Sequence, residues 1–266
     1  MPEYSITSVA GTVLALFGAA GEGLEPGAAA ADARVLAAAP KGGVRKLLIY
    51  APDAIGRLAI SKFPAAFSGL EGAGFLKFPV RSVFPSKTPV CYASMFSGLA
   101  PAGHGITQYA KPVLKCRTIF DALPARGVRT AIAAVKDSSI DLIFRGRRVD
   151  YCSEPYDREV TARALELIAA GNHECVLAYH QCYDDTLHAT DPWNAAAQEA
   201  IKDHVSAFRE LTAAFDKKWR GVPRAALFAP DHGAHIDPAT GRGVHGADIP
   251  SDMDVAHFWK FGTKDI

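Results

Sequence analysis

Short runs of apolar residues alternate with amphipathic segments along most of the chain. Residues 195–219 have apolar positions at helical spacing, and the surrounding pattern also predicts helices over 5–18, 94–99, 118–123 and 158–170. Strands that alternate with helices are typical of a mostly parallel sheet covered by helices on both faces. We therefore expect one compact α/β domain over residues 1–266. Five apolar runs have the length of a strand: 46–51, 75–78, 130–135, 174–180 and 225–229.

Three segments interrupt this alternation. The Gly/Ala/Pro-rich stretch 18–40 predicts a loop of small residues. Residues 69–74 (GLEGAG) predict another loop, because their glycines lack the GxGxxG spacing of a nucleotide-binding turn. The segment 136–156 is a candidate for a small cap and carries Arg145, Arg147 and Arg148. Arginine suits phosphate because its planar fork donates two hydrogen bonds, although a solvated basic loop explains these residues equally well.

The composition is that of an ordinary soluble globular protein, with 49% apolar and 21% charged residues among 266. A formal net charge of +1 gives no broad basic surface, so we expect neither duplex nucleic acid nor a membrane as a partner. The five cysteines are odd in number and form no CxxC pair, which argues against a disulfide framework. Reduced cysteines, together with an N-terminal stretch that has no basic residue before its apolar run, predict a cytoplasmic location.

Carboxylates and imidazoles follow three of the predicted strands. In parallel sheets, ligands bind beyond the carboxyl ends of the strands, so these side chains are expected at one edge. A further histidine, His245, follows later in the sequence GVHGADIP. The residues that follow the strands are Asp53 after 46–51, Asp184 and His188 after 174–180, and Asp231 and His232 after 225–229.

Each of these residues, taken singly, has an ordinary explanation. Asp184 and His188 are four positions apart, a spacing that also suits a surface salt bridge on a helix. Asp53 is equally typical of a helix N-cap, and His245 of a loop. Taken together, the three carboxylates and three imidazoles predict a site for two divalent ions. Mixed carboxylate and imidazole ligands suit Zn²⁺ or Mn²⁺, and paired ions of this kind are typical of phosphoryl transfer.

The order of these motifs resembles the type I phosphodiesterase/nucleotide pyrophosphatase branch of the alkaline phosphatase superfamily. Members of that branch have a strand ending in Asp and a Lys-Thr nucleophile loop that leads to S…TG…P…HGI. A D-x-x-G-H motif, a D-H-G motif and a later H-G follow. The matching residues are Asp53, Lys87-Thr88, Ser94, Ser97-Gly98, Pro101, His104-Gly105-Ile106, Asp184 to His188 with Leu187 in place of Gly, Asp231-His232-Gly233, and His245-Gly246.

The resemblance implies an alkaline phosphatase-like fold, two divalent ions (Zn²⁺ or Mn²⁺) and a small-molecule phosphate ester as substrate. It implies that Thr88 attacks phosphorus and forms a covalent phospho-threonine, while the second ion activates the water that releases the phosphate. It also implies how the two ions are held. One ion would take Asp184, His188 and His245, and the other would take Asp53, Asp231, His232 and the oxygen of Thr88.

Two features depart from the pattern of that branch. Cys91 stands where the branch has an Asn that donates to the phosphate, so Cys91 and the neighbouring Tyr92 are candidate substrate-binding residues. The alternative for Cys91 is a small buried filler. The helix over 5–18 resembles one that usually follows the last H-G motif, which indicates a circular permutation and predicts that it packs near His257. Lys87 is expected to be a solvated surface residue.

The sequence therefore predicts a two-metal phosphoric ester hydrolase that acts through a phospho-threonine. One alternative is a metal-dependent phosphomutase or phosphomonoesterase of the same superfamily. A mutase usually needs an added cap that excludes water, and 266 residues leave little room for one. A non-catalytic module that binds metal or phosphate is the alternative from another class, but no metal-ligand position has been lost.

Overall fold

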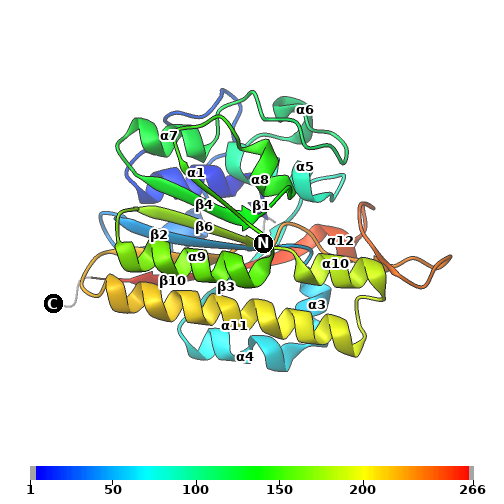
Figure 1. Cartoon of the computed structure of the whole chain (residues 1–266). Helices are drawn as coiled ribbons and strands as arrows, with labels where there is room; N and C mark the ends of the chain where they lie inside the picture. The colour runs from blue at the N-terminus through cyan, green and yellow to red at the C-terminus, as the bar shows by residue number, and fades with distance from the viewer. Residues whose placement is uncertain (1–3, 264–266) are drawn as a thin grey trace.

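The computed structural model describes residues 4–263 and contains one eight-stranded sheet in the order β1-β3-β10-β7-β2-β6-β4-β5 (Figure 1). Strand β10 runs antiparallel to β3 and to β7, and the other paired strands are parallel. The predicted mostly parallel sheet is confirmed. The strands are β1 (Tyr4–Ser5), β2 (Lys46–Pro52), β3 (Leu76–Arg81), β4 (Thr130–Val135), β5 (Asp150–Glu154), β6 (Cys175–His180), β7 (Arg224–Phe228) and β10 (Asp254–Gly262).

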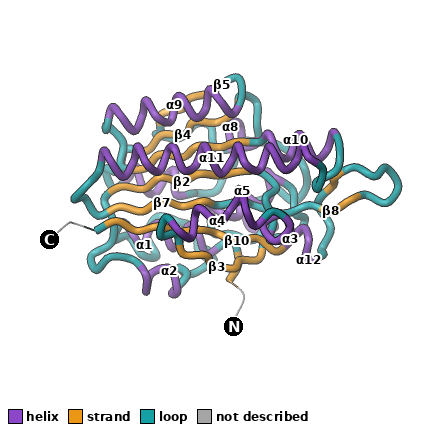
Figure 2. Tube along the Cα trace, turned by 90° about the horizontal axis from the view of Figure 1, so that it is seen from below, coloured by secondary structure: helices purple, strands orange, loops and turns teal. Residues whose placement is uncertain are grey.

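Helices cover both faces of this sheet, as Figures 1 and 2 show. Alternate residues of a strand point to opposite faces, so Leu47 and Ile49 of β2 lie in one apolar core and Leu48 and Tyr50 lie in the other. The first core is closed by α1 (Ser8–Leu16), α2 (Ala33–Ala38), α5 (Thr88–Ser97), α7 (Ile119–Ala125) and α8 (Ser139–Ile143). The second core is closed by α3 (Arg57–Lys62), α4 (Pro64–Gly72), α9 (Asp157–Ala170), α10 (Cys182–Ala189) and α11 (Ala195–Lys218).

Local sequence signals explain where the main helices begin and which side they bury. The side chain of Asn194 caps α11 by accepting from the N–H of Ala197, and the buried residues of this helix recur every three or four positions. Thr118 and Asp121 form a capping box at the start of α7. Three smaller elements lie beyond the carboxyl ends of the strands: α6 (Pro101–His104), the hairpin of β8 (His235–Ile236) and β9 (Gly243–Val244), and α12 (Pro250–Met253).

The structure differs from the sequence prediction in three segments. The expected loop 18–40 contains α2, which Asp32 caps, and the expected loop 69–74 begins inside α4. The segment 136–156 contains α8 and then β5, which pairs with β4 at the edge of the sheet. Two of its arginines make contacts within the fold: Arg145 pairs with Asp141, and Arg147 donates to Asp121 and to three backbone carbonyls.

The N-terminal helix α1 packs against the C-terminal strand β10. Val9 and Val13 belong to the same apolar core as Val255 and Trp259. Ser8, Val9 and Thr12 also line one small cavity together with His257 and Trp259. The neighbourhood predicted from the resemblance is therefore confirmed. Within residues 4–263, no helix has both the length and the apolar character that crossing a bilayer requires, and all five cysteines are free thiols.

Candidate active site

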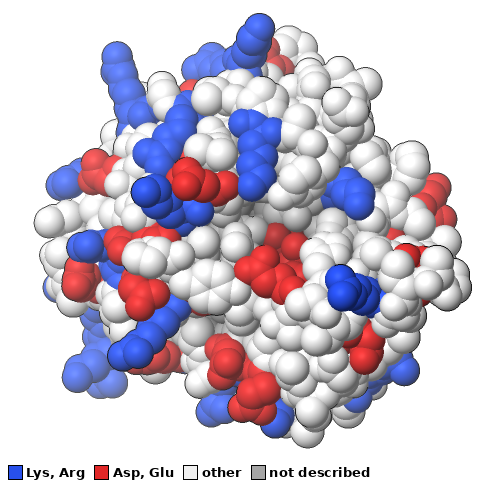
Figure 3. All heavy atoms as spheres, turned by 45° about the vertical axis from the view of Figure 1, so that its right-hand side comes forward, with Lys and Arg blue, Asp and Glu red and all other residues white. Residues whose placement is uncertain are grey.

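The carboxyl ends of the parallel strands bring the predicted site residues to one edge of the sheet. Asp53 follows β2, Thr88 begins α5 after β3, and Asp231 follows β7. A cleft of about 250 Å³ opens at this edge, and its lining includes Asp53, Thr88 and Asp184. Figure 3 shows acidic side chains gathered in a hollow near the middle of this face, with basic side chains above them.

One group of converging side chains is formed by Asp184, His188 and His245. Asp184 and His188 lie one turn apart on α10, as their spacing predicted, and His245 lies just after β9. The Nε2 atoms of the two histidines are 3.1 Å apart. Each Nε2 atom is 3.4 Å from Oδ1 of Asp184. Three potential metal-ligand atoms therefore meet at one point.

A second group is formed by Asp53, Asp231, His232 and Thr88, all of which are buried. Nε2 of His232 is 3.4 Å from a carboxylate oxygen of Asp53 and of Asp231. Oγ1 of Thr88 is 3.3 Å from Oδ1 of Asp53 and from Nε2 of His232. The two groups adjoin, because a ligand atom of His232 also lies within 4.8 Å of ligand atoms of Asp184 and His245.

Hydrogen bonds fix the proton positions on the three histidines. Nδ1 of His188 contacts the carbonyl oxygen of Gly243 at 2.9 Å, Nδ1 of His232 that of Gly233 at 3.0 Å, and Nδ1 of His245 that of Ser86 at 2.7 Å. A carbonyl oxygen can only accept, so Nδ1 carries the proton in each ring. In the neutral ring, each Nε2 atom then presents a lone pair toward the centre of the site. A backbone partner on the far nitrogen is typical of metal-binding histidines.

Two carboxylate oxygens in the site lack hydrogen-bond partners. Among residues 4–263, the buried side-chain atoms without a partner are Oδ1 of Asp184, Oδ2 of Asp231 and Nδ1 of His173. The first two belong to the two groups described above, one to each. An orphaned buried carboxylate oxygen is costly unless a cation or a proton satisfies it.

The buried carboxyl groups of Asp53 and Asp231 also have perturbed pKa values. Burial raises the pKa of Asp53 well above its usual value, and the charges of Asp231 and Asp184 raise it further. Burial likewise raises the pKa of Asp231. The backbone N–H of Ala54 donates to this carboxylate, which acts to lower the pKa but does not outweigh burial. Two carboxylates buried side by side repel each other, and positive charge between them would remove that repulsion.

The pKa of Asp184 moves the other way. Burial acts to raise it, but the imidazoles of His188 and His245, which favour the charged carboxylate when they are protonated, outweigh burial and hold the pKa below its usual value. The same contact with Asp184 raises the pKa of His188. His188 is also the exposed member of the site, with 43% of its side chain accessible to solvent.

These residues fit two divalent cations. The Nε2 lone pairs of the three neutral imidazoles and the oxygens of the three carboxylates converge on the site, and one oxygen in each group is an orphan. Imidazole nitrogen with carboxylate oxygen is a donor set that suits zinc or manganese. Asp184, His188 and His245 would hold one ion, and Asp53, Asp231, His232 and Thr88 would hold the other.

Several residues at the site were not predicted from the sequence. The hydroxyl of Tyr179 in β6 donates to Oδ2 of Asp53 at 2.5 Å and so orients that carboxylate. Lys111 and Lys136 line the cleft near the carboxylates. Lys136 directly follows β4, so it could have been found in the same way as Asp53, as a polar residue at the carboxyl end of a strand. Tyr179 gave no signal, because a tyrosine in an apolar strand is typical of a core residue.

Three residues beside the nucleophile position have defined surroundings. Lys87 is half-buried and donates to the carbonyl oxygen of His245 at 2.5 Å, so the prediction of a solvated lysine was wrong. Cys91 is fully buried and contacts Ser82, and burial raises the pKa of its thiol well above the usual value. Tyr92 is also fully buried, and its hydroxyl donates to the carbonyl oxygen of Pro52. The structure therefore shows no side-chain donor of Cys91 or Tyr92 pointing into the cleft.

Three residues of the C-terminal segment hold the loops that carry metal-ligand candidates. Asp252 is buried and accepts from the N–H groups of Gly246 and Ala247, directly after His245. His235 contacts the other oxygen of Asp252 at 2.7 Å. His257 contacts the carbonyl oxygen of Pro230, directly before Asp231, at 3.0 Å.

Replacing His257 with Gln should reduce the loss of stability in acid. Burial lowers the pKa of His257 to about 4, so between pH 6.5 and 4 the unfolded chain binds a proton that the folded chain does not. This contribution destabilises the wild type by at most about 1.4 kcal/mol per pH unit as the pH falls. Urea unfolding at several pH values should show a shallower slope for His257→Gln than for the wild type. Equal slopes would contradict a buried neutral His257.

Comparisons with known proteins agree with this site. Residues 67–235 match the sequence model of the type I phosphodiesterase/nucleotide pyrophosphatase family, a match that includes Thr88, Asp184, His188, Asp231 and His232. None of the curated proteins matches this chain in sequence.

Solved structures show the same fold at low sequence identity. The C-terminal periplasmic domain of the phosphoethanolamine transferase EptC from Campylobacter jejuni is 14% identical, with a TM-score of 0.62 over 82% of this chain and 80% of that one. Murine ectonucleotide pyrophosphatase/phosphodiesterase 5 is 18% identical, with a TM-score of 0.56 over 71% of this chain. Phosphonoacetate hydrolase from Sinorhizobium meliloti 1021, in complex with phosphonoacetate, is 17% identical, with a TM-score of 0.53 over 72% of this chain.

This chain covers 57% of the length of each of the last two proteins. Their shared architecture is that of the alkaline phosphatase superfamily, which agrees with the mostly parallel sheet flanked by helices. The family match spans well over half of the 266 residues and contains most of the converging side chains. The chain belongs to the type I phosphodiesterase/nucleotide pyrophosphatase family, whose members are phosphoric ester hydrolases.

Proposed function

We propose that this protein hydrolyses small phosphate esters with two divalent metal ions and a covalent phospho-threonine. One observation carries the proposal: the hydroxyl of Thr88 lies 3.3 Å from both Asp53 and His232, beside two orphaned carboxylate oxygens. A hydroxyl placed among metal-ligand atoms is suited to act as a nucleophile, because a weakly acidic alcohol needs a nearby cation or base.

The chain supplies the groups for a balanced two-step reaction. When bound, the divalent ions would neutralise phosphoryl oxygens and lower the pKa of the Thr88 hydroxyl. Oγ1 of Thr88, held beside Asp53 and His232, loses its proton to solvent in the cleft and bonds to phosphorus while the bond to the leaving oxygen breaks; the leaving oxygen takes up a proton from solvent and departs as the alcohol. Water then attacks phosphorus, the Thr88 O–P bond breaks, and a proton restores the hydroxyl. The N-terminus of α5, where Thr88 lies, adds favourable potential for the phosphoryl anion.

The cleft supports a small anionic substrate. Its volume is about 250 Å³, and its wall carries Lys111 and Lys136 in addition to the acidic floor. Ammonium groups in this position would attract a second negative group on the substrate or the non-bridging phosphate oxygens. We therefore propose a low-molecular-weight ester as the substrate, and a cytoplasmic location remains the prediction from the free cysteines.

The alternative of a phosphomutase has less support from the structure. A mutase must keep water from the phospho-enzyme so that the phosphoryl group returns to the substrate. The segment proposed as a cap, 136–156, forms α8 and the edge strand β5, and the described residues contain no separate cap domain. A phosphomonoesterase would use the same nucleophile and ligands.

Removal of metal should abolish hydrolysis. We expect the purified protein to hydrolyse bis-p-nitrophenyl phosphate or p-nitrophenyl phosphate, to lose this activity on exhaustive chelation, and to regain it when Zn²⁺ or Mn²⁺ is added. The relative rates on the two esters measure the preference for diesters over monoesters. Activity that survives complete removal of metal would rule out the proposed mechanism, and a metal-loaded protein inactive on both esters would favour the non-catalytic binding module.

A further inference from the structure

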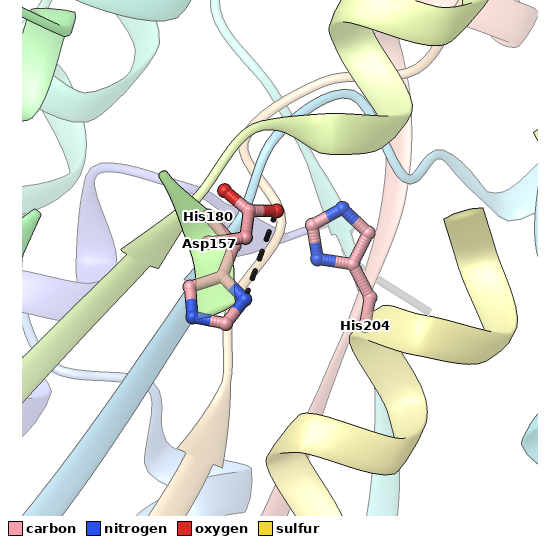
Figure 4. A group of neighbouring side chains, drawn as sticks. All are labelled: Asp157, His180 and His204. Carbon is pink, nitrogen blue, oxygen red and sulfur yellow. Dashed lines mark ion pairs between the residues drawn. The ribbon is translucent and has the colours of Figure 1, made fainter. Parts of the chain in front are cut away.

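A second cluster of buried polar groups lies on the face of the sheet covered by α9 and α11. Asp157 begins α9, His180 ends β6 and His204 lies on α11, and Figure 4 shows their side chains close together. The hydroxyl of Tyr50 bridges the two imidazoles, 2.8 Å from Nδ1 of His180 and 2.9 Å from Nδ1 of His204. A groove of about 500 Å³ opens onto this cluster, and its lining includes Cys182 and Asp203.

This cluster differs from the candidate metal site in its hydrogen bonding. Ligand-type atoms of Asp157, His180 and His204 lie within 4.8 Å of one another, so distance alone would admit an ion. None of the three residues, however, contributes an orphaned polar atom among residues 4–263. A cation here would replace satisfied hydrogen bonds rather than complete missing ones.

The proton positions can be followed through the cluster. Nε2 of His204 accepts from the N–H of Tyr183 at 3.3 Å, so its Nδ1 carries the proton and donates to the oxygen of Tyr50. The hydroxyl of Tyr50 then donates to Nδ1 of His180, and Nε2 of His180 donates to Thr161 at 3.2 Å. Burial lowers the pKa of His180 to about 3 and that of His204 to about 4, which agrees with two neutral rings.

The cluster holds the beginning of α10. One carboxylate oxygen of Asp157 accepts from the N–H of Gln181 at 2.9 Å, and the other accepts from the N–H of Cys182 at 3.0 Å. His204 accepts from the third N–H group in this row, that of Tyr183. The first N–H groups of a helix have no partner inside the helix, so side chains of α9 and α11 supply all three acceptors.

We propose that Asp157, assisted by His204, is the positioning residue for the metal half-site of Asp184 and His188. The inference rests on the proposed two-metal function. Asp184 and His188 both lie on α10, whose first turn is fixed by the cluster, whereas Asp53, Asp231 and His232 follow strands β2 and β7. The two side-chain oxygens of Asp157 bond to α10. Loosening α10 would therefore disturb one half-site and leave the other intact.

The test is Asp157→Asn with Asp203→Asn as its matched control. Asparagine has the size of aspartate, but its NH₂ group would face one of the two N–H donors of α10, so at least one bond is lost. Asp203 is exposed and lines the same groove, and its replacement removes the same charge without touching α10. The readouts are zinc titration of the metal-free protein and hydrogen exchange of the amides of Gln181, Cys182 and Tyr183.

We expect two zinc sites in the wild type and in Asp203→Asn. In Asp157→Asn, one site should weaken about 10- to 100-fold while the other keeps its affinity, as found when groups supporting a metal ligand are removed. Exchange of the three amides should accelerate in the metal-free Asp157→Asn protein, while amides in the middle of α11 stay protected. Should Asp157→Asn fail to fold, His204→Gln tests the same anchor and predicts the same one-sided loss.

Other outcomes would overturn the inference. Unchanged zinc affinities in a folded Asp157→Asn protein, or an equal loss at both sites, would show that Asp157 does not position α10 selectively. A third zinc ion that is lost in His204→Gln would show that the cluster is itself a metal site. A wild-type protein that binds neither zinc nor manganese would refute the proposed function instead. In that case, amide exchange that is unchanged in Asp157→Asn would separately refute the anchoring of α10.

Discussion

Thr88→Ala should lower kcat for phosphate ester hydrolysis by about a thousandfold or more while most of the bound metal remains. Removal of a covalent nucleophile generally costs this much or more, because the remaining groups can only stabilise a slower direct attack by water. The alanine variant keeps the six carboxylate and imidazole ligands, which come from β2, α10, β7 and the loop after β9. The measurement is kcat beside the metal content of the same folded preparation.

Thr88→Ser is the matched control for this substitution. Serine keeps a hydroxyl at the first position of α5 and should retain a measurable fraction of the wild-type rate. If Thr88 served only to begin the helix, alanine would cost about 1 kcal/mol of stability and little rate. A folded Thr88→Ala protein that turns over near the wild-type rate would therefore remove Thr88 from the mechanism.

Asp231→Asn should abolish turnover together with the binding of one of the two metal ions, and yet stabilise the metal-free protein at pH 8. Asp231 is fully buried, and its orphaned Oδ2 faces His232. Burial raises the pKa of Asp231 and also that of Asp53. The negative charge of Asp231 raises the pKa of Asp53 further. A carboxyl group with a raised folded-state pKa stabilises the fold below pH 3.8 and loses this contribution as the pH rises through the raised value. At pH 8, well above 3.8, the metal-free wild type has therefore lost stability that asparagine, which does not titrate, keeps.

The measurement is the Tm of both proteins in chelator at pH 8, together with metal content and kcat after reloading. A lower Tm for Asp231→Asn in chelator would show that the carboxylate serves the fold rather than a cation. Retention of both metal ions would contradict the ligand assignment. The opposite effects expected on stability and activity distinguish this residue from a structural aspartate such as Asp157, whose oxygens both accept hydrogen bonds.

The sequence indicated those strands that are buried on both faces. Such strands are continuous apolar runs, as in β2 and β4, and they stand out from their surroundings. The edge strand β5 (DYCSE) is polar and half-exposed, so it looked like a loop. Strand β10 was also missed, because Lys260 and the buried His257 interrupt its apolar pattern and its register depends on two neighbours far away in the chain.

The candidate ligands could be found from the sequence because each one follows a strand or continues a family motif. The structure brings all seven predicted metal-site residues together, and their assignment to two ions stays a prediction. Supporting residues such as Tyr179 and Asp157 could not be found in this way. Their roles depend on a partner more than twenty positions away, Asp53 in one case and the amides of α10 in the other, and neither residue type is unusual in its segment.

The position of β10 has a consequence for how the molecule folds. This strand comes last among those that the structure describes, but it lies inside the sheet, where it joins β1 and β3 to β7 and the other strands. The segment after β3 leads to Thr88, and the segment after β7 carries Asp231. Until β10 has paired with both strands, β3 and β7 do not belong to the same sheet, so these two segments are not held together. Pairings between such distant segments form slowly, since a long loop must close before they contribute stability. The appearance of enzymatic activity during refolding should therefore report the insertion of the final strand.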